Sequence, residues 1–148
     1  DVDVAYWDER MSLNLRPMFF AAQVAAEQMI KAGGGSIINF GSVSVQMALG
    51  GLPLYVTAKA AIHGLTRSLA RDLGEHNIRV NTLVPGAVMT ERQLEKWISP
   101  KDEAAIQQRQ CLKMRLESQH IAPVALFLAS AESQAITAQE LAVDAGWA

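Results

Sequence analysis

Three side chains with complementary chemistry lie close together in the sequence: Ser42, Tyr55 and Lys59. Residues four apart on a helix share a face, so Lys59 can hold its ammonium near the Tyr55 hydroxyl. A nearby cation favours phenolate over phenol, and a tyrosine in that setting can act as a general acid or base. Taken alone, the same spacing also fits a tyrosine at the edge of the core beside a solvated lysine. The residues around the pair favour the chemical interpretation.

The apolar run Ser36–Phe40 leads directly into Gly41 and Ser42. Such a run predicts a short strand, which places Ser42 at the carboxyl end of that strand. Open α/β sheets bind their ligands at this end, and a serine hydroxyl can both donate and accept a hydrogen bond.

The segment from Gly41 to Lys59 resembles the active site of the short-chain dehydrogenase/reductase family. The resemblance implies that Ser42 hydrogen-bonds the substrate oxygen, that Tyr55 moves the hydroxyl proton, and that Lys59 supports Tyr55 and holds the cofactor ribose. Asn14 resembles the asparagine that completes the family's proton relay through a water molecule. By itself, Asn14 also fits a polar residue that interrupts a helix.

The strand-like run Ile78–Val84 ends in Pro85 and Gly86, and this segment resembles the family's contact with the nicotinamide ring. Glycine lets the backbone approach closely, proline fixes a turn, and the Thr90 hydroxyl suits a carboxamide or a phosphate oxygen. The resemblance implies NAD or NADP as cofactor, held by Tyr55, Lys59, Pro85, Gly86, Val88 and Thr90. Residues 139–146 resemble the family's last strand and its closing Asp-x-Gly, so the resemblance covers nearly all 148 residues.

Residues 90–98 stand where the family carries its substrate lid, and they fit either a lid helix or an amphipathic surface helix. Together with residues 109–113, they resemble the family's aldose dehydrogenases, which act on pentose-type sugars. This resemblance implies a small alcohol or carbonyl substrate of the sugar class. The candidate substrate contacts are Ser44, Glu91, Arg92 and Trp97, of which the last three offer hydrogen bonds and an apolar platform.

The family normally opens with a strand, a Gly-rich turn and a helix that bind the dinucleotide pyrophosphate. The sequence contains no such turn, because Gly33–Gly35 follows a predicted helix and precedes a strand, as a helix C-cap and connector would. We therefore expect residues 1–148 to form one incomplete domain, the C-terminal portion of a Rossmann-type doubly wound parallel α/β sheet. The chain starts at Asp1 without a methionine, which suggests a cut or incomplete chain.

Two functions follow from this organisation: a working oxidoreductase, or a catalytically silent remnant that serves as an oligomerising or interaction module. Charge-assisted hydrogen bonds contribute about 1.5–3 kcal/mol each. Loss of the pyrophosphate contacts would therefore turn roughly micromolar cofactor binding into millimolar binding. The strand at Ser36 would also lack a neighbour, so a second copy, a complementary fragment or a rearranged segment must cover its edge. The family's subunit packing implies a homo-oligomer, a dimer or tetramer, through helices 17–31 and 55–73.

The composition predicts a globular protein of the cytoplasm. Half of the residues are hydrophobic, 19% are charged, and the net charge of −2 offers no basic field for nucleic acid or anionic lipid. No apolar run is long enough to span a membrane. The single cysteine, Cys111, excludes an internal disulfide and is expected to be a buried or half-buried apolar thiol. The histidines, His63, His76 and His120, lack metal-ligand spacing and are expected at the surface or as caps.

Helical periodicity alternates with short apolar runs, and this alternation predicts a parallel sheet. We expect helices over residues 6–15, 17–31, 55–73 and 118–128, with a variable helical stretch over 91–110. We expect strands over residues 36–40, 79–83 and 141–143, and a loop over 43–54.

Overall fold

A computed structural model describes residues 2–47 and 49–148; Asp1, and Ala48 in the expected loop, lie outside the described residues. Helices α1 (Val4–Asn14) and α2 (Arg16–Ala32) precede β1 (Gly35–Phe40), and α3 (Pro53–Leu73) joins β1 to β2 (Ile78–Pro85). Helices α4 (Glu91–Lys96), α5 (Pro100–Arg109) and α6 (Ser118–Ala129) then lead to β3 (Glu140–Val143). Short 3₁₀ turns follow α3, at Gly74–His76, and α6, at Ala131–Ser133. The predicted α/β alternation is confirmed.

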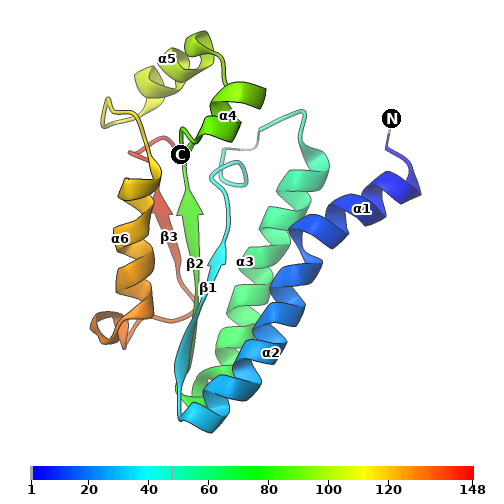
Figure 1. The fold of residues 1–148 in the computed structure, drawn as a ribbon, viewed down its shortest axis with the longest axis vertical. Coiled ribbons are helices and arrows are strands. Elements are labelled where there is room, and N and C mark those ends of the chain that lie inside the picture. The colour runs from blue at the N-terminus through cyan, green and yellow to red at the C-terminus, as the bar shows by residue number, and fades with distance from the viewer. Residues whose placement is uncertain (1, 48) are drawn as a thin grey trace.

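The described residues form one three-stranded parallel sheet in the order β1-β2-β3. Gly35 lies opposite Ile78, and Thr82 lies opposite Glu140. Helices α2 and α3 cover one face of the sheet, α6 covers the other, and α4 and α5 stand beyond the carboxyl ends of the strands (Figure 1). This layering leaves β1 at one edge of the sheet with no described strand beside it.

Each face of the sheet has its own apolar core. On one face, Ala22 and Ala26 of α2 and Ala70 of α3 let these helices pack closely on Ile37 and Val80. On the other face, the core consists of Leu83, Leu116, Ile121 and Leu128. Strand β2 is buried along nearly its whole length, as expected for a central parallel strand covered on both faces.

The helix ends follow local chemistry that the sequence displays. Pro17 lies in the first turn of α2, and Gly33 ends that helix with a φ of 84°, which confirms the interpretation of Gly33–Gly35 as a cap and connector. Helix α3 begins at Pro53 rather than at Tyr55, because proline suits the first turn of a helix. The stretch 91–110 divides into two helices because Ser99 and Asp102 form a capping box that starts α5.

The prediction that Cys111 is a buried or half-buried thiol was wrong. Its side chain is exposed, although its backbone N–H donates to the Gly146 carbonyl at 3.0 Å. Cys111 lies in the turn that follows α5, where the backbone is anchored and the side chain remains in solvent. Among the described residues, no helix is long and apolar enough to cross a membrane.

Candidate active site

Ser42, Tyr55 and Lys59 all lie at the carboxyl end of the sheet, where β1 ends and α3 begins. The Nζ atom of Lys59 lies 5.7 Å from the centre of the Tyr55 ring and donates a hydrogen bond of 2.9 Å to the Phe40 carbonyl. This bond ties the first turns of α3 to the end of the strand that leads to Ser42. Tyr55 is 36% exposed, so a ligand can reach it from solvent.

The Lys59 ammonium is half-buried and is bonded to a neutral carbonyl. Burial lowers the pKa of this ammonium, because a charged group loses hydration when it leaves water. The ammonium lies over the Tyr55 ring at a cation–π distance. The geometry therefore suits the predicted pairing of Lys59 with Tyr55.

Ser42 is supported by a second serine. Its Oγ accepts hydrogen bonds from the backbone N–H of Ser44 at 3.2 Å and from the Ser44 hydroxyl at 2.9 Å. Because Ser42 accepts both bonds, its own O–H is left to donate to a bound molecule. Ser44 is only 4% exposed. The structure places the Ser44 hydroxyl against Ser42, which it orients. Contact of Ser44 with a substrate remains a prediction.

Asn14 is the last residue of α1, and its amide nitrogen donates to the Arg10 carbonyl at 2.9 Å. This local bond orients the half-buried side chain, and α1 packs against the helix that carries Tyr55 and Lys59. The relay role of Asn14 remains a prediction.

The segment after β2 forms a tight turn against the C-terminal strand. Gly86 donates its backbone N–H to the Val143 carbonyl at 3.0 Å, and a Cβ on Gly86 would lie 2.8 Å from Cα of Asp144. Only glycine fits this approach. Further along, Thr90 caps α4 by accepting the Gln93 N–H at 3.3 Å, so its oxygen already has one structural role.

An apolar hollow of about 410 Å³ opens beside this turn, between the end of the sheet and α6. Phe40, Pro85 and Val88 line it together with residues of α6. A hollow of this kind at the carboxyl ends of parallel strands suits a flat ring, because such a ring buries its apolar faces there.

The predicted substrate residues Glu91, Arg92 and Trp97 lie on or next to α4 and are exposed. The Arg92 guanidinium carbon lies 5.5 Å from the centre of the Trp97 ring, a cation–π distance. Helix α4 stands above the carboxyl end of the sheet (Figure 1), a position that fits both the lid and the surface-helix interpretation.

The sequence interpretation missed His63. The expectation of a surface or capping residue was wrong, because His63 is 8% exposed and its Nδ1 lies 2.8 Å from Oε2 of Glu140. The other oxygen of Glu140 lies 2.9 Å from Nη2 of Arg67. His63 follows Lys59 by one helical turn on α3, and this spacing was the available signal. Among the described residues, no group of histidine, cysteine and carboxylate side chains is placed to hold a metal ion.

The other two histidines match the expectation better. His120 is a cap, since its Nδ1 accepts the Glu117 N–H at 2.9 Å. His76 lies in the turn after α3 with a partly exposed side chain.

The whole chain matches a known protein family: the family described as Enoyl-(Acyl carrier protein) reductase matches residues 1–148. D-xylose 1-dehydrogenase of Caulobacter vibrioides is 52% identical over 147 residues, which are 99% of this chain and 59% of that enzyme. The chain belongs to the short-chain dehydrogenase/reductase family. The predicted resemblance is thereby confirmed.

Other short-chain dehydrogenases give the same result. The protein of Rhizobium meliloti named "Probable galactose dehydrogenase" is 48% identical over 95% of this chain and 55% of its own length. A 7α-hydroxysteroid dehydrogenase complexed with NADH superposes with a TM-score of 0.93 at 35% identity, over 99% of this chain and 57% of its own. A gluconate 5-dehydrogenase from Burkholderia cenocepacia, in complex with NADP and tartrate, superposes with a TM-score of 0.91 at 30% identity. This match covers 99% of this chain and 57% of that enzyme. The Rossmann-type fold is confirmed, and the chain spans less than two thirds of each of these relatives.

Proposed function

We propose that this chain carries the catalytic part of an NAD(P)-dependent oxidoreductase that interconverts a secondary alcohol and a carbonyl. One observation carries the proposal. The Lys59 ammonium lies beside the Tyr55 ring and is bonded to Phe40, at the end of the strand that leads to Ser42. A phenol hydroxyl suited to acid–base chemistry, a neighbouring ammonium and a serine hydroxyl at the ligand-binding end of a parallel sheet support this proposal.

The residues present fit the nicotinamide end of the cofactor. The hollow beside Phe40, Pro85 and Val88 is apolar. The turn at Gly86 would let a ligand approach the backbone closely, and the Thr90 hydroxyl lies at the start of α4. When bound, NAD or NADP would accept or give the hydride. The NADH and NADP named for two solved relatives support this cofactor class.

The chain's own residues would handle the proton and the oxygen. Tyr55 would take the hydroxyl proton of an alcohol or return it to a carbonyl oxygen. Ser42 would donate its free O–H to the same oxygen, in the orientation that Ser44 fixes. Lys59 would stabilise the ionised tyrosine and hold the ribose, and Asn14 would hold the water of the relay. We place the catalytic half of a single incomplete domain in residues 1–148.

A sugar is the substrate class that the site supports best. The relatives named as D-xylose and galactose dehydrogenases are the basis, at 52% and 48% identity. Glu91 and Arg92 offer hydrogen bonds to hydroxyl groups, and the Trp97 indole offers an apolar surface to a sugar ring.

A homo-oligomer, a dimer or tetramer, is part of this proposal. Helix α2 exposes Phe19, Phe20 and Val24 on its outer surface. Such a row of large apolar side chains is typical of a surface that another subunit covers.

The direct test is Tyr55→Phe, with Tyr6→Phe as the matched control because Tyr6 lies on α1 outside the site. Turnover of D-xylose and D-galactose with NAD and NADP would be measured for both variants. General acid–base catalysis contributes roughly 10²–10⁴-fold, so the Tyr55 variant should lose at least about a hundredfold in kcat. The melting temperature of Tyr55→Phe should remain near that of the parent chain. Full turnover without the Tyr55 hydroxyl would remove the proposal.

The silent remnant is the competing function. The observation that favours it is the edge of β1, beside which the described residues place no strand. Fluorescence titration of the chain with NADH and NADPH separates the two functions. Micromolar binding would support an enzyme that is competent as it stands. An absence of binding at millimolar cofactor would support the remnant.

A further inference from the structure

The side chain of His63 links the third strand to the end of the first strand. It lies one helical turn beyond Lys59 on α3 and is buried. Its Nδ1 lies 2.8 Å from Oε2 of Glu140, the first residue of β3. On the other edge of the ring, Nε2 lies so close to Gly41 that a Cβ on that glycine would overlap it. The imidazole therefore fills the space between β3 and the backbone that leads into Ser42.

The contact with Glu140 fixes the orientation of this ring. A carboxylate only accepts hydrogen bonds, so Nδ1 of His63 carries the proton and donates to Glu140. The other Glu140 oxygen lies 2.9 Å from Nη2 of Arg67, which holds the carboxylate in place. Nε2 then keeps a lone pair on the side that faces Gly41.

This Nε2 atom breaks a general rule of protein interiors. Among the described residues, it is buried and has no hydrogen-bond partner. The Gly41 N–H already donates to the Leu83 carbonyl at 2.9 Å, on the β2 side. Buried polar atoms without a partner are rare and destabilising, and an apolar side chain of similar size would fill the same space without that penalty. A role toward its neighbours therefore explains His63 better than packing alone does.

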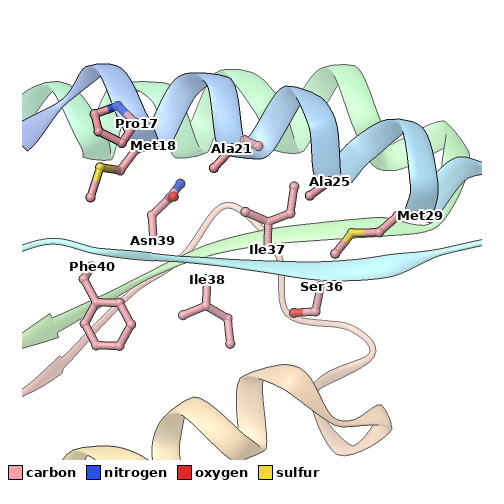
Figure 2. A pocket seen from close by; sticks show the side chains of 11 residues that line it. Pro17, Met18, Ala21, Ala25, Met29, Ser36, Ile37, Ile38, Asn39 and Phe40 are labelled. Carbon is pink, nitrogen blue, oxygen red and sulfur yellow. The ribbon is translucent and has the colours of Figure 1, made fainter. Parts of the chain in front are cut away.

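Helix α3 holds the end of β1 at two successive positions on one face of the strand. Figure 2 shows Asn39 pointing toward α2, on the face of the sheet that α3 also covers, whereas Phe40 points to the opposite face. The Asn39 amide donates to Oγ1 of Thr66 at 2.9 Å. Gly41 lies two residues further along, on the same face, and meets His63. Because His63 and Thr66 are three residues apart on α3, one side of the helix holds both positions.

These contacts bear on the geometry of the candidate active site. Tyr55 and Lys59 lie on the same helix as His63. Helix α3 therefore carries the acid–base pair and also the side chain that sets the backbone before Ser42. We propose that His63 is a positioning residue of the oxidoreductase, an inference that rests on the proposed function. Held by Glu140, it fixes the end of β1 so that both hydroxyls of the site meet the same substrate oxygen.

The first test separates positioning from packing with His63→Leu. Leucine has a similar volume, and it removes both the unpaired nitrogen and the contact with Glu140, so the chain should be at least as stable as the parent. A displacement of about 1 Å can cost roughly a hundredfold in rate, so kcat for D-xylose or D-galactose should fall at least about tenfold. KM for NAD or NADP should change little. A parent-like kcat in folded His63→Leu would overturn the proposal.

Glu140 supplies a matched pair of variants. Glu140→Ala removes the acceptor of His63, whereas Glu140→Gln keeps a side-chain oxygen for it. We expect kcat to fall at least about tenfold in the alanine variant and to be largely restored in the glutamine variant. Arg67→Ala, which removes the exposed partner of Glu140, should keep the parent kcat. Equal kcat in the two Glu140 variants would contradict the proposal, and this pair decides the question where His63→Leu does not fold.

Amide hydrogen exchange tests the same contact without turnover. The Gly41 N–H donates to Leu83, so its exchange rate reports how firmly the end of β1 is held. In His63→Leu, exchange at Gly41 should quicken at least about tenfold. Gly35, which donates to Asn77 at the opposite end of β1, should change little. Unchanged exchange at Gly41 would overturn the inference even in an active enzyme.

The two readouts distinguish the inference from the proposed function. A parent chain that turns over neither sugar would contradict the proposed function. Faster exchange at Gly41 in His63→Leu would still show that His63 orders the backbone before Ser42.

Discussion

Nε2 of His63 lies 2.6 Å from the position that a Cβ on Gly41 would occupy. The imidazole therefore packs directly on the backbone that carries Ser42. Its other nitrogen is held by Glu140 at 2.8 Å, so the ring cannot turn away without losing that contact. The glycine before the serine is thus required by packing from α3, because no positive φ is recorded there.

Gly41→Ala should destabilise the chain. The added methyl group would also lie 2.9 Å from Cγ2 of Thr82, so the strand end must shift. We expect the free energy of unfolding to fall by about 1–3 kcal/mol, the usual cost of overpacking, measured by urea denaturation. In a His63→Ala background, Gly41→Ala should cost less than in the parent, because the ring that the methyl group meets is gone.

Gly64→Ala is the control for this prediction. A Cβ at Gly64, in the middle of α3, meets no atom within 4 Å. Alanine favours a helix over glycine by about 0.8–1.0 kcal/mol, so this variant should be as stable as the parent or slightly more stable. A Gly41 variant as stable as the Gly64 variant would show that the contact with His63 is not close.

Glu140 should matter more to stability than Arg67, although both belong to one cluster with His63. The Glu140 side chain is 22% exposed and receives the buried imidazole, whereas the Arg67 side chain is 67% exposed. Glu140→Ala leaves His63 without its acceptor, at a cost of about 1–3 kcal/mol. Arg67→Ala removes an exposed ion pair and should cost less than about 1 kcal/mol. Chemical denaturation of both variants checks this order. Glu140→Gln keeps an acceptor, so its loss of stability should lie between those of Glu140→Ala and Arg67→Ala.

Much of the fold could be predicted because its signals are local. Pro17 and Gly33 mark the ends of α2 by their own backbone preferences, and the apolar run after Gly35 marks a strand. His63 could not be placed in this way. It packs on the backbone at Gly41 and contacts Glu140, which lies far away in the sequence and reaches α3 only because β3 pairs with β2.

In the candidate site, too, contacts within one helix could be predicted, whereas contacts between elements could not. Tyr55 and Lys59 are helix neighbours, so their proximity follows from spacing alone. The hydrogen bond from Lys59 to Phe40 depends instead on how α3 docks against the end of β1. The hydrogen bond from the Ser44 hydroxyl to Ser42 likewise depends on the turn after β1, which spacing alone does not predict.

Acid should loosen the start of α5 through Asp102. The side-chain hydrogen bond from Ser99 at 2.5 Å, followed by the Ser99 backbone N–H, holds the pKa of the Asp102 carboxyl below its usual range. Because the pKa is lower in the folded state, the unfolded chain takes up this proton first as the pH falls. The stabilisation is therefore complete above the unfolded value of about 3.9 and is lost as the pH falls through the lowered folded value.

An NMR titration of the α5 amides would follow this loss. Asp102→Asn should show weaker protection of the first turn of α5 at neutral pH and no transition in acid. A parent-like acid transition in that variant would assign the effect to another carboxylate.

Thr66→Val should lower the free energy of unfolding substantially, although valine has nearly the same shape as threonine. The Thr66 hydroxyl oxygen accepts hydrogen bonds from Asn39 at 2.9 Å and from Thr82 at 2.8 Å, and all three side chains are buried between α3 and the sheet. Valine would leave two buried donors without an acceptor, and each unsatisfied group costs about 1–3 kcal/mol. Thr66→Ser keeps the hydroxyl and removes one methyl group, which should cost roughly 1 kcal/mol. Urea denaturation should therefore show that Thr66→Val is much less stable than Thr66→Ser. The reverse order would mean that methyl packing, rather than the hydroxyl, holds α3 to the strands beneath Gly41 and Ser42.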